Sequence, residues 1–156
     1  MPVLPFEDTG LAPGGAEFSE VIVTRYVIGP DVALMLAERR EKIPAGHRLL
    51  APTLLRSQVL AQLYAQTRAG LLTRKEAGLR LDHLRGLNLR LLGDRVLQRM
   101  AWEVAEQLGW KDTFVAEYVA LTKLQADALV VRDVALKQAV GALIPVASPE
   151  ELLARP

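Results

Sequence analysis

The chain has 156 residues, of which 51% are hydrophobic and 24% charged, and its formal net charge is +1. This length and composition predict one globular domain with its own core and exclude a largely disordered chain. The nearly neutral charge argues against a nucleic-acid footprint over the whole surface but leaves room for a local basic patch. The absence of cysteine excludes disulfides, thiol nucleophiles and cysteine zinc sites, and it fits a cytoplasmic location.

Residues 1–19 contain several Pro and Gly residues and have neither a basic segment nor a continuous apolar run. They are therefore predicted to form a flexible N-terminal arm rather than a secretion signal, and residues 20–156 to form the domain. No stretch approaches the roughly 18 uncharged apolar residues of a membrane span, so no membrane association is expected.

Short apolar segments alternate with helical patterns along the domain. We expect strands at 20–28, 47–52, 88–92, 127–131 and 142–148. Helices are expected between them at 31–42, 53–70, 73–87, 93–110, 111–125 and 132–140, with a last helical turn at 149–154. This alternation predicts an α/β fold: a three-layer sandwich with a parallel sheet of four or five strands.

Several residue types at helix starts predict capping. Thr73 stands three residues before Glu76, as in a capping box. Thr53 precedes the second helix, Asp31 is expected to cap the first, and Asp112 or Thr113 the helix at 111–125.

Familiar catalytic motifs are missing from the sequence. The chain has no G-x-x-x-x-G-K-[ST] or G-x-G-x-x-G loop for phosphates and no G-x-S-x-G nucleophile turn. Its two histidines, His47 and His83, belong to different predicted elements, which argues against a histidine-based site. What remains is a carboxylate cluster at the carboxyl ends of the strands, where Mg²⁺ would activate water.

The order of elements resembles the PIN domain, and within it the VapC-type toxins of toxin–antitoxin pairs. The resemblance runs from about Thr24 to Leu153, and the run "YVALTKLQADALVVRD" matches the family's helix, strand and terminal acid. The segments that carry it are "RYVIGPDVAL", "LLAPTLLRSQVLAQL", "DTFVAEYVALTKLQADALVVRDVAL" and "GALIPVASPEEL". The resemblance implies a small endoribonuclease that uses Mg²⁺ or Mn²⁺, forms a homodimer and is neutralised by an antitoxin protein.

Carried over residue by residue, the resemblance leaves one acid of four. Gly29 stands where the family's first acid ends strand one, and Gln58 holds the second position. Val115 holds the third position, and Asp133 keeps the fourth. The positions expected to take part in catalysis are therefore Asp133 and Gln58, while Gly29 and Val115 supply no side-chain ligand.

Neighbouring acids are the candidates for a rebuilt metal site. Asp31 lies two residues after Gly29, and Asp112 lies three residues before Val115. One hypothesis is therefore a metal site formed by Asp133, Asp31 and Asp112. The alternative role of each of these three residues is to cap a helix. The other acids are expected to be solvated, to cap helices or to lie at the opposite end of the sheet: Asp82, Asp94, Glu117 and Asp127.

Basic residues gather in the middle of the sequence, and an RNA-binding role is predicted for Arg68, Arg74 and Lys75. Further cations follow at Arg80, Arg85 and Arg90. Charge runs on helices are also typical of solvated faces, and few aromatic residues are available for stacking on bases.

Three hypotheses follow. The first is a PIN-like protein with a degenerate metal site and weak or no cleavage, acting through RNA or protein binding. The second is an active endoribonuclease with a rearranged acidic site that uses Mg²⁺ or Mn²⁺. The third is a homodimeric interaction module without a nucleic-acid role and without a cofactor.

Overall fold

The computed structural model describes residues 22–155, so the predicted N-terminal arm lies outside the described part of the chain. Its strands form one parallel five-stranded sheet in the order β3-β2-β1-β4-β5. The strands are β1 (Thr24–Val27), β2 (His47–Pro52), β3 (Arg90–Leu92), β4 (Ala128–Val130) and β5 (Val146–Ala147). The prediction of an α/β sandwich with a parallel sheet is confirmed.

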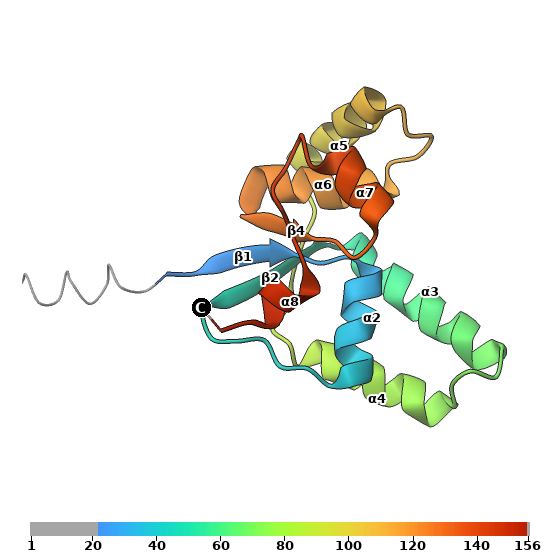
Figure 1. The fold of residues 1–156 in the computed structure, drawn as a ribbon. Helices are drawn as coiled ribbons and strands as arrows, with labels where there is room; N and C mark the ends of the chain where they lie inside the picture. Colours follow the sequence, from blue (N-terminus) through green and yellow to red (C-terminus); the bar gives the residue numbers. More distant parts are fainter. Residues whose placement is uncertain (1–21, 156) are drawn as a thin grey trace, which may run out of the picture.

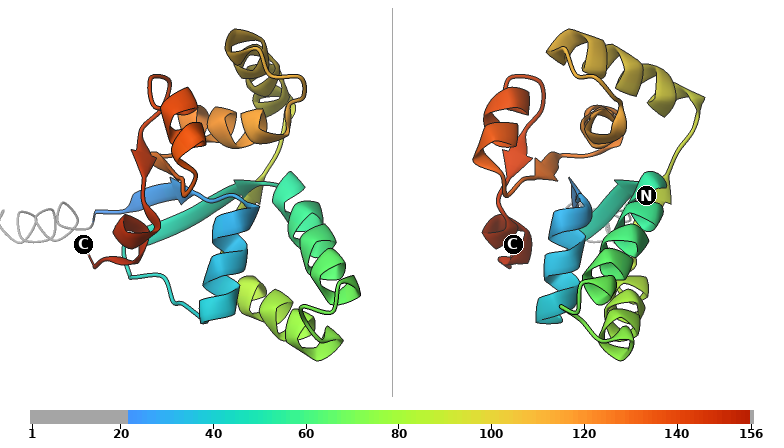
Figure 2. Two further views of the ribbon diagram at one scale, coloured as in Figure 1. Left: turned by 45° about the vertical axis from the view of Figure 1, so that its right-hand side comes forward. Right: turned by 90° about the vertical axis from the view of Figure 1, so that its right-hand side faces the viewer.

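Helices cover both faces of this sheet, as Figures 1 and 2 show. They are α2 (Pro30–Arg39), α3 (Leu54–Arg68), α4 (Arg74–Arg85), α5 (Arg95–Leu108), α6 (Phe114–Gln125), α7 (Val134–Val140) and α8 (Pro149–Leu153). The helices α5, α6 and α7 lie on one side, and α2, α3 and α4 on the other (Figure 1).

The two faces of the sheet follow from the alternation of side chains along each strand. The register aligns Val27 with Leu50 and with Leu129, so these three side chains share the face that α6 covers. Tyr26 and His47 belong to the other face, where their rings meet edge to face with centroids 5.0 Å apart. Both faces are buried at mid-strand, which explains why the central strands have no polar alternation.

Strand lengths are where the structure and the prediction differ most. β1 begins at Thr24, and β5 has only two residues because Gly141–Leu143 form a turn before it. β5 lies at the border of the sheet and pairs with β4 alone, through Leu129 and Val130. The β propensity of residues 142–148 predicted a longer strand, but β5 pairs with only one short neighbour, and this pairing sets its length.

Most helix ends agree with the predicted caps. The capping box of Thr73 and Glu76 is present, with Oγ1 of Thr73 accepting from the Glu76 amide at 3.0 Å. Thr53 takes the N-cap position of α3 without a side-chain hydrogen bond. The sequence analysis did not predict a second capping box, formed by Ser148 and Glu151 at α8. No helix within residues 22–155 is long and apolar enough to cross a membrane.

Candidate functional site at the carboxyl edge of the sheet

The carboxyl edge, where the parallel strands end, brings the four family positions to one side of the molecule. α2, α3 and α7 each begin directly after a strand, so Gly29, Gln58 and Asp133 lie at or near this edge. α6 runs back toward β4 and ends just before it, which puts the first turn of α6, with Val115, at the same edge. Such an edge is where open α/β sheets bind ligands.

At the end of β1, Gly29 is the N-cap of α2 and Pro30 is the first helical residue. The prediction that Asp31 caps this helix is wrong, because proline takes the first position of the helix and moves its start one residue earlier. Oδ1 of Asp31 lies 3.2 Å from where a Cβ on Gly29 would stand. The Asp31 carboxylate therefore lies beside the place of the family's first acid.

Gln58 is held by a hydrogen bond that crosses from α3 to α6. The phenol of Tyr118 donates to Oε1 of Gln58 at 2.6 Å. Tyr118 is 4% exposed, and burial raises its pKa, with smaller contributions from the carboxylates of Glu117 and Asp31. Tyr118 thus stays protonated at neutral pH, and Oε1 of Gln58 accepts a hydrogen bond from its hydroxyl instead of facing solvent as a free ligand.

Glu117 is half-buried rather than solvated, so its predicted role is corrected. Burial raises the pKa of its carboxyl group. The reason is that α6 is buried on most of its circumference, from Ala116 and from Tyr118 to Thr122. The sequence carried this signal, because a helix that is apolar nearly all round is a buried one, and its few polar residues are then partly buried too.

The first turn of α6 presents apolar side chains at the edge. Phe114 is 52% exposed and Val115 is 41% exposed. Thr113 takes the N-cap position without a side-chain bond, while Oδ1 of Asp112 accepts from the Phe114 amide at 3.3 Å. Asp112 is therefore engaged with the start of the helix, in agreement with the predicted alternative to a metal ligand.

Asp133 caps α7. Its Oδ1 accepts from the Ala135 amide at 3.1 Å, and the next residue, Val134, is 67% exposed. This is the capping role that the sequence analysis set beside a metal ligand. The carboxylate keeps lone pairs for another partner, but it enters the site already bound to the backbone.

Within residues 22–155, no group of three or more His, Asp or Glu side chains is placed to hold one metal ion. Asp31, Asp112 and Asp133 therefore do not form the three-carboxylate set that the rearranged nuclease requires. Mg²⁺ prefers several charged oxygen ligands in octahedral geometry. The donor set at the four family positions, one capping carboxylate and one bonded amide, does not fit it.

The other three aspartates considered in the sequence analysis and both histidines have structural partners. Oδ1 of Asp94 accepts from the Leu97 amide at 2.9 Å as the cap of α5, and Asp82 pairs with Arg85 at 2.6 Å. Asp127 lies at the opposite edge, as predicted, where it accepts from the Arg25 amide at 2.7 Å. The imidazoles of both histidines lie within hydrogen-bond distance of backbone carbonyls: His47 of Leu152 and His83 of Glu41.

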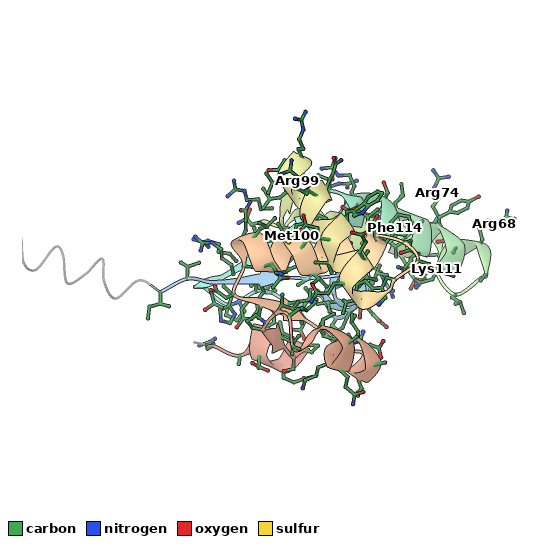
Figure 3. The ribbon with its side chains drawn as sticks, turned by 90° about the horizontal axis from the view of Figure 1, so that it is seen from above. Arg68, Arg74, Arg99, Met100, Lys111 and Phe114 are labelled. Atoms are coloured by element: carbon green, nitrogen blue, oxygen red, sulfur yellow. The ribbon has the colours of Figure 1, made fainter. Side chains whose placement is uncertain are left out.

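The basic residues of the middle helices do not form one cluster. Arg68 ends α3 and Arg74 and Lys75 begin α4, so these three lie exposed at the tip of the α3–α4 pair. Figure 3 shows Arg68 and Arg74 there. Arg85 is paired with Asp82, and Arg90 lies on β3, next to a hollow at the start of the strands. Helix direction separates residues that are close in sequence.

Comparison with known proteins gives the fold and no more. No family model matches the chain, and no curated protein matches it. Among solved structures, the chain is similar to the crystal structure of PAE2754 from Pyrobaculum aerophilum, with 19% identity and a TM-score of 0.63. The similarity covers 85% of this chain and 95% of that chain. At this identity it supports the shared α/β architecture alone.

Proposed function

We propose that the chain is a PIN-domain-like protein related to VapC toxins, with a degenerate metal site and weak or no cleavage, which acts by binding a partner at the carboxyl edge. The resemblance in the sequence and the parallel sheet with helices on both faces support this origin. The proposal of partner binding in place of cleavage is supported by the residues present at the carboxyl edge of the sheet.

One observation carries the proposal: the four family positions hold a glycine, an amide, a valine and a carboxylate that caps a helix. Losing three charged ligands of four removes most of the affinity of such a site for Mg²⁺. The neighbouring Asp31 adds one carboxylate beside Gly29, but among the described residues no three acids stand together to hold a metal ion.

Exposed apolar side chains at this edge favour a protein partner. Phe114, Val115 and Val134 lie in the first turns of α6 and α7 and are between 41% and 67% exposed. A nuclease site would need charged and polar groups there to hold a metal and phosphate. Apolar side chains rimmed by polar ones are typical of protein-binding surfaces. An antitoxin-like protein is the partner that the family resemblance implies.

RNA is the second candidate partner. Arg68, Arg74 and Lys75 are exposed on the tip of the α3–α4 pair and supply three cations for phosphate contacts. The homodimer stays a proposal as well, supported by Val96 and Trp102, which are 57% and 64% exposed on α5. Light scattering over a range of concentrations tests it.

The test is a comparison of the chain with a restored variant, Gly29→Asp/Gln58→Glu/Val115→Asp. We expect no cleavage of a mixed RNA pool by the chain as it stands in Mn²⁺, and cleavage by the restored variant. A second readout is Mn²⁺ binding by calorimetry, which we expect to be measurable only in the restored variant. Asp133→Ala in the restored background is the matched control and should abolish cleavage.

Cleavage by the original chain that is lost in Asp133→Ala would overturn the proposal and favour a rebuilt nuclease site. The partner-binding part has its own test: Phe114→Ser/Val134→Ser should weaken binding of a protein partner without changing the fold. The matched control is Val96→Ser/Trp102→Ser on α5. If both double variants weaken partner binding equally, the partner does not bind at the carboxyl edge.

A further inference from the structure

The amino edge of the sheet, where the parallel strands begin, carries an open hollow of about 460 Å³. Its lining includes Arg25 on β1, Arg90 on β3 and Lys123 near the end of α6, together with the last two residues of α6 and the short loop through Asp127. Three separate elements therefore contribute one cation each. This hollow lies at the end of the sheet opposite to the candidate site.

Strand register explains why the arginines gather. Arg25 aligns with Arg48 on β2, and Leu50, two residues further, aligns with Arg90 on β3. Residues two apart on a strand point to the same face, so the side chains of Arg25, Arg48 and Arg90 leave the sheet on one side. This is the side covered by α6, whose C-terminal end brings Lys123 to the same hollow.

None of these three cations forms a salt bridge with another described residue. The only salt bridge among residues 22–155 is between Arg85 and Asp82. The one acid in the lining, Asp127, is held by the Arg25 amide at 2.7 Å. Asp127 contributes one negative charge and the carbonyl end of α6 about one half, against the three positive charges, so the hollow keeps a surplus of positive charge.

A concave surface with like charges focuses the field and attracts ligands of opposite sign. Keeping arginines side by side on neighbouring strands costs stability, because like charges opposite each other repel. The planar guanidinium group matches two oxygens of a phosphate at once, which makes arginine the preferred residue for phosphate recognition.

We propose that this hollow is a second binding site, specific for ligands that carry linked phosphate groups, with Arg25, Arg90 and Lys123 as its phosphate-binding side chains. Free polyphosphates and the backbone of a nucleic acid share this chemistry. The site is independent of the proposed function at the carboxyl edge, since it uses none of the same residues.

Calorimetric titration with sodium tripolyphosphate tests the proposal. We expect saturable binding that weakens with salt, and a Kd raised about tenfold or more in Arg90→Gln/Lys123→Gln, since this variant loses two charged hydrogen-bond donors together. The matched control, Arg74→Gln/Lys75→Gln, removes two exposed cations elsewhere and should change the Kd less than about twofold, in line with mere loss of net charge. All four side chains are exposed, so circular dichroism should show unchanged folds.

Three results would overturn the site: no tripolyphosphate binding, equal loss in both variants, or equally tight binding of citrate, an anion of similar charge without phosphate. A single-stranded RNA of about ten nucleotides then identifies the source. If it displaces tripolyphosphate, and the slope of log K against log salt falls in the Arg90/Lys123 variant, the site holds a nucleic-acid backbone. If it does not displace it, the site holds a small polyphosphate.

Discussion

The carboxyl and amino edges of the sheet treat their charged residues in opposite ways. At the carboxyl edge, Asp112 and Asp133 are bound to backbone amides and apolar side chains are exposed. At the amino edge, arginines of neighbouring strands stand side by side without carboxylate partners in the described chain. The edge that the fold reserves for chemistry thus uses two of its acids at helix starts, and the cations without salt bridges lie where no catalytic role was expected.

This difference teaches that the fold and the chemistry of a site are separable. The strands end at the carboxyl edge for reasons of topology, and they do so whether or not acids stand there. A position in the fold therefore indicates where to look, while the donors present decide what can happen. Among the substitutions below, we expect the largest loss of stability from removing the hydrogen bond between Tyr118 and Gln58 at the carboxyl edge.

Tyr118→Phe should lower the free energy of unfolding by about 1–3 kcal/mol, because the half-buried amide of Gln58 loses its donor. Urea unfolding measures this cost. The double variant Tyr118→Phe/Gln58→Leu should recover most of the loss, since it removes both polar partners together. If the double variant is as unstable as Tyr118→Phe alone, the bond does not hold α3 and α6 together as described.

Asp133→Ala should cost about 1 kcal/mol through loss of the α7 cap, while Asp133→Asn should be nearly neutral because asparagine caps as well as aspartate. Thermal unfolding with and without Mn²⁺ checks this. If Asp133→Asn lowers the melting temperature more in the presence of Mn²⁺ than in its absence, Asp133 is a metal ligand and its role is not limited to capping α7.

Arg48→Gln should raise the free energy of unfolding by a few tenths of a kcal/mol at low salt, because Arg48 faces Arg25 across the strand pair. The gain should shrink as salt screens the repulsion. Arg68→Gln, at the tip of the α3–α4 pair, is the control and should change stability less. A stability loss in Arg48→Gln would mean that the arginines of the amino edge are paired rather than crowded.

Much of the fold was predictable because its signals are local. Alternating apolar segments gave the helices and strands, and Thr73 with Glu76 identified a helix start that the structure confirms. The errors also have local causes. Pro30 starts α2 before the expected cap at Asp31, and the border strand β5 is shorter than its apolar run because it has one neighbour only.

The candidate site was predictable in position but not in contacts. The order of elements placed Gly29, Gln58, Val115 and Asp133 on one edge without knowledge of any distance. The hydrogen bond from Tyr118 to Gln58 joins residues 60 positions apart, and no pattern within one element predicts such a pair. Glu117 was misjudged because its burial depends on the sheet and helices packed around α6.

By itself, the sequence determined the alternation of elements, the parallel sheet, the capping box of Thr73 and Glu76, and the absence of three expected acids, since each is a property of residue type and short-range spacing. The tertiary structure alone decided that the Asp31 carboxylate lies beside Gly29 and that the hydroxyl of Tyr118 donates a hydrogen bond to Gln58. It also decided that three arginines share one face of the sheet. These depend on strand register and helix packing, which are set by contacts between distant parts of the chain.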